Sequence, residues 1–587
     1  MYSRILISTG AIVTLLGAGA AEPKVRFVPQ PDLKVSGFWA ERLDRLESAW
    51  IPHCWKRLGV HRGAFQRNLA EATMMALERH PERKDLADIL ERFVADDITA
   101  QKPDGYVGRH DPHYVDFSRH ELYGQGYFIE TAVRHMDFTK GRDRRYFDAA
   151  IRLGDHLDST FGPPPKRTWT DGHPGVEKAL LMLADAVDRW DGRGKGEKYA
   201  ALARYFIRHQ NDIPEYRHKY CQSHEPAVAM AEAVGHAVRG TYFYAGMAGS
   251  AWRCNDDELA AAARRVFESA IDRKGYLTGG VGGNWAGEAF APDYALPNAR
   301  AYLEGCAGCG MYDWCTEMAM MDGIGRFEDV RERVVYNNLL GTFSEDCTRY
   351  AYQNPPASAN PRYPWHTLPC CVGNVPRVLE DFKNRMYAVS SDGRTLYVNH
   401  FIASTGGSAT MGDAHLRMEM ATSYPDDGKV EIKVSADRPA TFTMRVRMPN
   451  RAESALYAAK PEVPHGHQDF TVALTQQADG SISTKSIRFE LPLPLQCVTC
   501  DKRVKANRGL VAWQRGPIVF SWEGPGFTER VPYWRRLNAG GPSRVWIPAD
   551  GSAPTAETVA GEWFRGTGCP LDADNRKVTS SCFLKER

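Results

Sequence analysis

Two cysteine-containing segments hold the residue types that could do chemistry. The first, GEAFAPDYALPNARAYLEGCAGCG (287–310), carries two glutamates and two thiols, and the second, HTLPCCVGN (366–374), carries an adjacent pair of thiols. Three thiolates and one carboxylate are an acceptable tetrahedral ligand set for zinc. That set would be Glu304, Cys306, Cys370 and Cys371. Glu288 would then remain as a free acid beside the metal.

Each half of this set also has a plainer explanation. Vicinal cysteines such as Cys370 and Cys371 also occur as two buried thiols or as a strained disulfide. Glu304 and Cys306 are two residues apart, and side chains at that spacing do not face the same way on a helix. They could share a metal only at a helix start, where the backbone is not yet helical. The residues alone leave a metal site and a structural cluster open.

Three histidines sit among apolar residues at the edges of expected helices. They are His120 in RHELYGQGYFIE, His173 in DGHPGVEKAL and His236 in EAVGHAVRGTYFY. A lone histidine in such a place is more often a hydrogen-bonded core residue than a ligand. At the mouths of separate helices in a barrel, however, the three would converge on one cavity. Neutral imidazoles and a tyrosine are suitable donors and acceptors for sugar hydroxyls.

The segments that must position these residues are mainly helical from Phe38 to about Met386. Apolar residues recur at three-to-four spacing, as with Leu43, Leu46 and Trp50, and Gly, Pro or Asp breaks separate the segments. About a dozen such helices suit a barrel of paired helices. The periodicity equally describes an irregular helical domain.

After Ser390 the apolar period changes to two. Segments such as GKVEIKV and TFTMRVRMP alternate apolar and polar positions, and turn signals separate them. Strands of this length predict a β-sandwich. We therefore expect a helical domain over 22–390 and a β region over 391–587, which could divide into two small β domains with the second from about 506.

The N-terminus has the pattern of a secretory signal peptide over residues 1–21. Arg4 precedes an apolar run from Ile5 to Leu16, and small residues follow. This run is too short for a comfortable membrane span, and no later stretch is long and apolar enough. We expect a secreted or periplasmic protein with no membrane span after processing.

Composition narrows the classes further. The net charge is +2 with 25% charged residues, so no basic field favours nucleic acid as a partner. The 13 cysteines are odd in number and lack the spacing of a small disulfide-stapled domain. Cys497 and Cys500, in CVTC, could be a local disulfide or two buried thiols.

Several motifs, in order along roughly residues 35 to 525, together resemble glycoside hydrolase family 127. They are HELYGQGYFIE, GHPGVEKAL, GHAVR, YLEGCAGCG with GEAF sixteen positions before its glutamate, YQNP and LPCCVGNVPR. That family is typified by β-L-arabinofuranosidases. The chain has Gly305 where the family's usual motif is ETC, and Val372-Gly373 where it is CCPPN. Every ligating side chain is kept.

The resemblance implies an (α/α)6-barrel catalytic domain followed by one or more β-sandwich domains. It implies retaining, exo-acting hydrolysis of an oligo- or polysaccharide. Zinc would be held by Glu304, Cys306, Cys370 and Cys371, with Cys370 as nucleophile and Glu288 as general acid/base. The sugar site would be lined by His120, His173, His236 and Tyr352.

Two other function classes stay open beside this one. The first is a zinc-stabilised carbohydrate-binding protein, in which the cysteines and the glutamate are purely structural. Glu288 and the three histidines argue against it. The second is an α/α-barrel polysaccharide lyase or epimerase, which would use His or Tyr as a base and has no need of a thiolate cluster. The sugar, its linkage and formation of a homo-oligomer are left open by the sequence.

Overall fold

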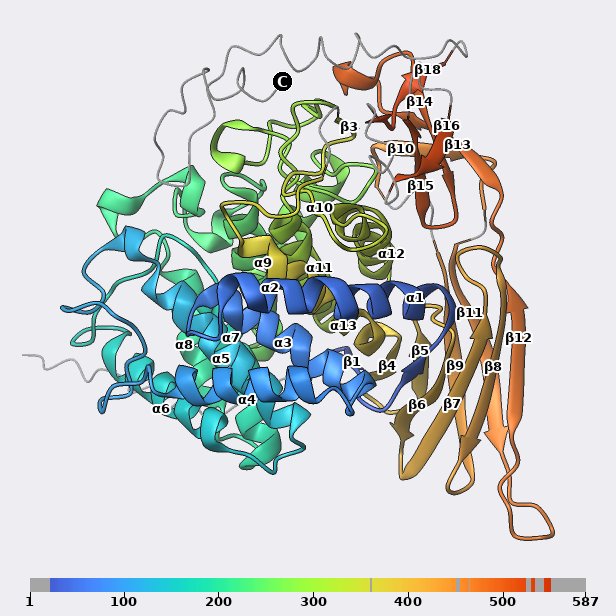
Figure 1. Cartoon of the computed structure of the whole chain (residues 1–587), viewed down its shortest axis with the longest axis horizontal. Helices are drawn as coiled ribbons and strands as arrows, with labels where there is room; N and C mark the ends of the chain where they lie inside the picture. The colour runs from blue at the N-terminus through green and yellow to red at the C-terminus, as the bar shows by residue number, and fades with distance from the viewer. Residues whose placement is uncertain are drawn as a thin grey trace, which may run out of the picture.

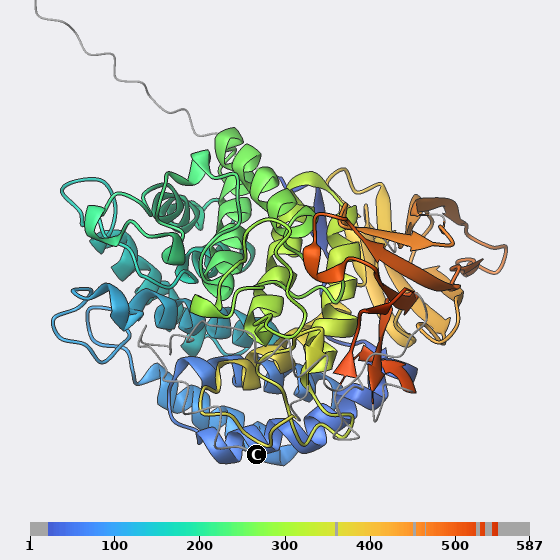
Figure 2. The same cartoon turned by 90° about the horizontal axis from the view of Figure 1, so that it is seen from above.

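The computed structural model describes residues 22–358, 362–449, 454–463, 465–523, 529–533 and 543–549. The expected signal peptide lies outside these residues. Helices dominate the first part of the chain and strands the last, and the strands lie to one side of the helices (Figure 1 and Figure 2). The change falls between η9 (Phe382–Arg385) and β4 (Tyr387–Ser390).

Long helices contact one another in turn around a ring. They are α3 (Ala64–Arg79), α5 (Glu121–Phe138), α7 (Val176–Trp190), α9 (Ala237–Arg253), α11 (Gly305–Asp322) and α13 (Cys370–Asp381). Helix α13 contacts α3 and closes the ring. Every residue of α11 from Gly305 to Ala319 is buried, as expected for a helix surrounded by protein on all sides.

A second helix follows each of the first five ring helices and packs against it. These helices are α4 (Lys84–Ile98), α6 (Arg145–Thr160), α8 (Glu197–Arg208), α10 (Asp257–Asp272) and α12 (Arg326–Arg333). The first four are amphipathic, as the apolar spacing predicted: α6, for example, buries Phe147 and Leu157. Helix α12 differs, because it buries charged residues from Glu328 to Arg333. Helices α1 (Gly37–Arg45) and α2 (Ile51–Leu58), joined by η1 (Leu46–Trp50), precede the ring, and α2 contacts both α3 and α13.

The described strands form three sheets. One has the order β1 (Val25–Phe27), β4, β5 (Thr395–Val398), β9 (Ala440–Met448), β11 (Gly466–Leu474). Another has the order β12 (Lys485–Glu490), β8 (Lys429–Ala436), β7 (Ala414–Thr422), β6 (Ser404–Met411), β2 (Lys34–Val35). The third contains β10 (Tyr457–Lys460), β13 (Leu495–Cys500), β14 (Leu510–Arg515), β15 (Ile518–Glu523), β16 (Glu529–Pro532), β17 (Ser543–Arg544), β18 (Ile547–Pro548) and β3 (Ala357–Ser358).

The period-two interpretation holds in these sheets. Phe442, Met444 and Val446 of β9 are all buried, while Thr441, Thr443 and Arg445 are more exposed. Strands β1 and β2 were not predicted: they are too short to show a period, and they bring the start of the described chain into two of the sheets.

Cys497 and Cys500 lie three apart on β13, so their side chains point to opposite faces of the sheet. Both are free thiols. The local disulfide that the sequence left open is therefore not formed.

Buried ion pairs join the sheets to the helices. Arg447 of β9 is 1% exposed, and its guanidinium donates to Asp329 and Glu332 of α12 at 2.5 and 2.7 Å. His400 Nε2 lies 2.8 Å from Glu328 Oε2 on the same helix. The strand region thus supports an outer helix of the ring. In the described part of the chain, the helices lack the combination of length and apolar character needed for a membrane span.

Candidate active site

The residues singled out in the sequence gather at the N-terminal ends of the ring helices. His120 directly precedes α5, and His173 lies three residues before the first residue of α7. His236 and Glu304 are the N-cap residues of α9 and α11, and Cys370 begins α13. Helix N-termini carry partial positive charge, which favours carboxylates and thiolates placed there. The ring therefore collects side chains that are far apart in the sequence.

The four expected metal ligands form one compact group. The ligand atoms of Glu304, Cys306, Cys370 and Cys371 all lie within 4.8 Å of one another. Glu304 Oε1 accepts hydrogen bonds from the Cys370 and Cys371 sulfurs at 3.3 and 3.7 Å. These two sulfurs are 3.8 Å apart, far beyond the roughly 2.05 Å of a disulfide bond.

The chemistry of this group fits a zinc ion. Glu304 is 4% exposed, and its Oε2 is buried with no hydrogen-bond partner among the described residues. Leaving a buried carboxylate oxygen unsatisfied is costly unless a ligand completes it. Three sulfurs and one carboxylate are also a donor set that zinc accepts. The residues present therefore suit the metal that the sequence analysis expected.

Local backbone geometry lets Glu304 and Cys306 share this point. Glu304 has extended angles (φ −60°, ψ 140°), whereas Cys306 is the second residue of the helix. Because the N-cap residue is not helical, its side chain does not follow the helical spacing. The sequence requirement that the pair lie at a helix start is met. Cys309, one turn further along α11, is fully buried and does not belong to this group.

The glycines in the two unusual motifs allow close packing around these ligands. A Cβ at Gly373 would lie 2.8 Å from the backbone nitrogen of Leu69. Helix α13 therefore comes close to α3 at a position where α13 has no side chain. A Cβ at Gly305 would lie 3.1 Å from Val375 Cγ2 and 3.5 Å from Cys371 Sγ. The ring helices thus lie in close contact beside these cysteines, and glycine fits at both positions.

Of the three cysteines in this group, Cys370 is the most exposed. Cys306 and Cys371 are 2% and 0% exposed, whereas Cys370 is only half-buried. Its sulfur lies 3.2 Å from the hydroxyl of Tyr352, whose ring stacks on His366. Burial holds the pKa of Tyr352 well above its usual value, so this hydroxyl remains protonated and can donate. A small molecule could therefore reach Cys370 more readily than the other two.

Glu288 lies beside the ligand group and is held by His236. His236 Nδ1 accepts from the backbone N–H of Val238 at 3.2 Å, so the ring proton sits on Nε2 and is donated to Glu288 Oε2 at 3.0 Å. Burial raises the pKa of Glu288, but hydrogen bonds from His236 and Tyr302 outweigh it, and the net pKa is lowered. Glu288 also has a left-handed φ of 52°, a strained conformation that is common at functional sites.

The other two histidines complete the cluster. The ring of His173 lies 5.6 Å from that of His120 and 6.3 Å from that of His236, measured between centroids. His120 Nδ1 lies 3.0 Å from Asp171 Oδ1, which also accepts from the backbone N–H of His173 at 2.9 Å. Burial, reinforced by nearby Arg239, holds the pKa of His173 well below its usual value. His173 is therefore a neutral hydrogen-bonding group.

Sequence reasoning missed residues that hold the site from behind. Asp171 orients His120, and Tyr302 helps to lower the pKa of Glu288. Asn374 donates to Cys306. Asp171 lies two residues before His173 in DGHPGVEKAL, and Asn374 lies in LPCCVGNVPR. Their places in these motifs were a signal that could have found them. The contacts that they make could not be inferred from the sequence.

Other polar clusters and pockets of the described chain lack this chemistry. Asp104, His113 and His156 lie close together, but the Lys102 ammonium, 3.0 Å from His113 Nε2, already places a cation there. Asp44, Glu47 and His80 surround Arg79 in the same way.

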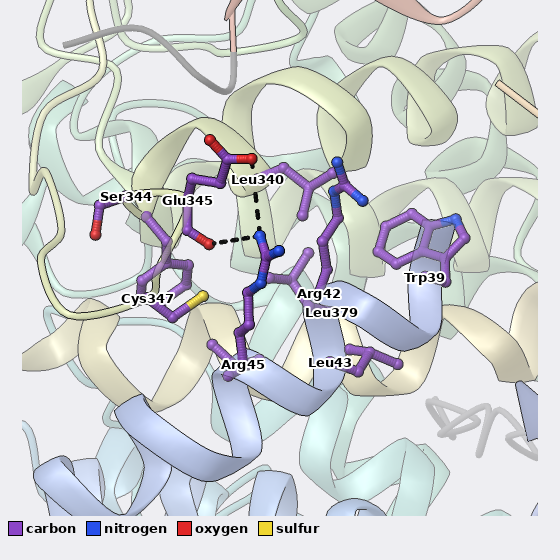
Figure 3. Close-up of a pocket in the computed structure, with 11 residues that line it drawn as sticks. Trp39, Arg42, Leu43, Arg45, Leu340, Ser344, Glu345, Cys347 and Leu379 are labelled. Atoms are coloured by element: carbon purple, nitrogen blue, oxygen red, sulfur yellow. Dashed lines mark hydrogen bonds and ion pairs between the residues drawn. The ribbon is translucent and has the colours of Figure 1, made fainter. Parts of the chain in front are cut away.

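A cavity of about 30 Å³ lies between α1 and the chain around Glu345 (Figure 3). Arg45 closes one side of it, and its Nη1 donates to the Glu345 backbone oxygen at 3.2 Å. Burial lowers the pKa of neighbouring Arg42 to about 10. The space suits a water molecule at most, so it is not a substrate site.

Comparisons with known proteins agree with the motifs. Residues 41–384 match the model of the β-L-arabinofuranosidase GH127 catalytic domain, and residues 395–479 match the GH127 middle domain. A non-reducing end β-L-arabinofuranosidase of Bifidobacterium longum is 29% identical over 507 residues, covering 77% of this chain and 74% of the relative.

Solved structures show the same family. A GH127 β-arabinofuranosidase superposes with a TM-score of 0.78 at 25% identity, covering 90% of this chain and 98% of that one. A GH127 β-L-arabinofuranosidase from Geobacillus stearothermophilus T6 shares the fold, with a TM-score of 0.76 at 24% identity, covering 88% of this chain and 99% of that one. The motif-based expectation is confirmed: this chain belongs to glycoside hydrolase family 127, the β-L-arabinofuranosidase family, and is a glycoside hydrolase.

Proposed function

We propose that this chain is an exported, retaining, exo-acting β-L-arabinofuranosidase that uses Cys370 as nucleophile and Glu288 as general acid/base. The observation that carries the proposal is the position of Glu288. Its carboxylate lies within 4.8 Å of that of Glu304, and Glu304 in turn accepts from Cys370. Glu288 and Cys370, the most exposed of the three cysteines, thus both lie close to Glu304.

A zinc ion would be held by Glu304, Cys306, Cys370 and Cys371. When bound, it would keep the thiols deprotonated. Without such help a free thiol, with a pKa of about 8.5, is only a few per cent thiolate at neutral pH. Cys306 and Cys371 are buried and serve as anchors. Cys370 is the sulfur that can also meet a sugar.

The reaction follows from the placement of these residues. The Cys370 sulfur attacks the anomeric carbon and forms a C–S bond while the C–O bond to the leaving group breaks. For this step Glu288 has to carry a proton in the complex with substrate, although its pKa in the free protein is lowered, and it gives this proton to the leaving oxygen. In the second half, Glu288 takes a proton from water, whose oxygen displaces the sulfur. Two inversions give net retention, with cysteine in place of the second carboxylate that most glycosidases use.

The neighbouring side chains would bind the sugar. Three neutral or partly buried imidazoles and a phenol provide donors and acceptors for hydroxyl groups. They are His120, His173, His236 and Tyr352. The names of the relatives, a non-reducing end β-L-arabinofuranosidase among them, favour a terminal β-L-arabinofuranosyl unit. The pattern of residues 1–21 supports export.

The helical part, in this proposal, is an (α/α)6 barrel. The closed ring of contacts among α3, α5, α7, α9, α11 and α13 supports it. Packing of a second helix on ring helices supports it further. The strand region would comprise β-sandwich domains, a reading favoured by the alternating burial of its strands.

Activity on a panel of substrates tests the function. The purified protein should release nitrophenol from an aryl β-L-arabinofuranoside faster than from galactofuranoside or pyranose analogues. The sugar released first, followed by NMR, should keep the β configuration. An unsaturated product absorbing in the ultraviolet would indicate a lyase instead. No turnover of any member would favour a binding protein.

Metal analysis tests the ligand set. The protein should carry about one zinc per chain, as four-ligand sites do. Cys306→Ser should lower metal content and thermal stability together, because metal-binding free energy at such a site contributes to folding. Cys309→Ser is the matched control: it changes an equally buried thiol one turn away and should keep its zinc. Undiminished zinc in Cys306→Ser would contradict the assignment.

A further inference from the structure

Asn374 lies at the centre of a buried polar network beneath the thiols. It is fully buried on α13, four residues after Cys370. Its Nδ2 donates to Cys306 Sγ at 3.4 Å and to the Tyr242 hydroxyl at 2.8 Å. Its Oδ1 accepts from Arg377 Nε at 3.0 Å. All parts of the side-chain amide are therefore engaged.

The neighbours of Asn374 decide which way its amide points. A guanidinium has only donors, so the group that faces Arg377 must be the amide oxygen. The NH₂ group must then face Cys306 and cannot be exchanged with the oxygen by a flip. The hydrogen bond to the sulfur is thus a donation, which favours negative charge on that sulfur.

Arg377 is itself held in place by charges from other ring helices. Its Nη2 lies 3.2 Å from Asp313 Oδ2 on α11, and the same oxygen accepts from Lys178 of α7 at 2.7 Å. Lys178 also lies 2.9 Å from Glu130 of α5. Each of these side chains is at most about one-tenth exposed. Four ring helices therefore contribute charges to the frame behind Asn374.

We propose that Asn374, oriented by Arg377, is a positioning residue for Cys306. The hydrogen bond from its side-chain N–H group fixes the direction of the Cys306 sulfur and stabilises negative charge on that sulfur. Groups that form hydrogen bonds to metal ligands orient those ligands and tune the affinity of the site for the metal. The inference rests on the metal site proposed above. It gives the buried charges between α5 and α13 a role in that site, in addition to joining helices.

Zinc affinity, measured by competition with a chelator, tests the proposal. Asn374→Asp keeps the shape of the side chain and its contact with Arg377, but it turns the donor that faces Cys306 into a negatively charged acceptor. Asn374→Ala removes the donor without adding charge. We expect zinc affinity to fall about 10–100-fold in both variants.

Asn337→Ala is the matched control. Asn337 is also fully buried, but its amide donates to the backbone oxygens of Arg333 and Pro517 at 3.0 and 2.9 Å. This variant should lose stability and keep the affinity of the wild type for zinc. A general loss of packing would lower affinity in Asn337→Ala and Asn374→Ala alike, and that result would overturn the proposal.

A spectrum of the cobalt-substituted protein separates positioning from packing. Loss of the hydrogen bond from Asn374 raises the energy of the Cys306 sulfur lone pairs. The sulfur-to-cobalt charge-transfer band of Asn374→Ala should therefore move to longer wavelength. The band of Asn337→Ala should not move. Wild-type affinity and an unshifted band in the Asn374 variants would overturn this inference alone. A wild-type protein that takes up neither zinc nor cobalt would overturn the metal site as well.

Discussion

The two ends of the ring helices are both polar, but they use their polar groups differently. At the N-terminal ends, Glu304 Oε2 has no partner in the part of the chain that the structure describes, and three thiols lie close to this carboxylate. At the C-terminal ends lies a cavity of about 780 Å³ lined by arginines and carboxylates. There Asp381 pairs with Arg134 and Arg385 at 2.8 and 2.9 Å.

In the proposed mechanism, this difference separates a reactive end from a stabilising one. Charges at the C-terminal ends neutralise one another, and the arginines also suit the negative ends of the helix dipoles. At the N-terminal ends the Cys370 and Cys371 sulfurs donate to Glu304 Oε1, but Oε2 finds no partner among the described residues. A carboxylate oxygen without a partner, rather than charged residues as such, marks the end at which we propose catalysis. Substitutions at the two ends should therefore fail in different ways.

The largest effect should come from Cys370→Ser. Without the thiolate no glycosyl-enzyme can form, and kcat should fall by several powers of ten for good and poor leaving groups alike. Steady-state kinetics on aryl β-L-arabinofuranosides with leaving groups of different pKa measure this. Activity that survives with activated leaving groups would place the nucleophile elsewhere.

Glu288→Gln should fail in a way that depends on the leaving group. Loss of general acid assistance typically costs about 10²–10⁴-fold, and that full cost should appear with alkyl or sugar leaving groups, which need protonation. An activated nitrophenol should suffer less. Azide should restore part of the turnover of that substrate, since it needs no base to attack the intermediate. Equal losses for all leaving groups would contradict the acid/base role.

At the opposite end, Asp381→Asn should affect stability and leave kcat/KM unchanged. Removing one partner of a buried ion pair leaves Arg134 and Arg385 uncompensated, which costs about 3–5 kcal/mol. Chemical denaturation measures the loss, and kinetics on the folded fraction provide the control. A drop in kcat/KM without a drop in stability would break the contrast between the ends.

Glu177 tests whether a carboxylate near the reactive end can be purely structural. It is 2% exposed, its Oε2 accepts from the Gly175 N–H at 2.8 Å, and burial raises its pKa from 4.5 to about 7. The folded state therefore binds the proton more tightly, so stability is greatest below pH 4.5 and declines as the pH rises to 7. The full difference is about 3 kcal/mol.

Glu177→Gln should remove this decline. Unfolding free energies of the wild type and the variant, measured from pH 5 to pH 8, should diverge with rising pH in favour of the variant. Parallel curves would show that Glu177 is ionised throughout that range and that burial does not control its pKa.

Local pattern predicted the elements well, because helix and strand periods are written into neighbouring residues. The apolar spacing of α6 and the alternation of β9 both match the structure. Strands β1 and β2, at three and two residues, carry no period. Only pairing with distant strands makes them strands.

The site depended on information that spacing does not hold. Cys370 and Glu304 are 66 residues apart, and His236 and Glu288 are 52 apart. Spacing alone therefore left the ligand set open, and the family motifs were needed to propose it. The orientation of Asn374 depends on Arg377 and on charges from three other helices, which pattern in one segment cannot reveal.

Trapping the glycosyl-enzyme tests the central claim most directly. The protein should be denatured during turnover of a reactive aryl β-L-arabinofuranoside and mapped by peptide mass spectrometry. The account predicts a pentosyl group on the peptide that contains Cys370, and none in Cys370→Ser. A sugar attached to the peptide that contains Glu288 would contradict the mechanism, even if the zinc site were intact.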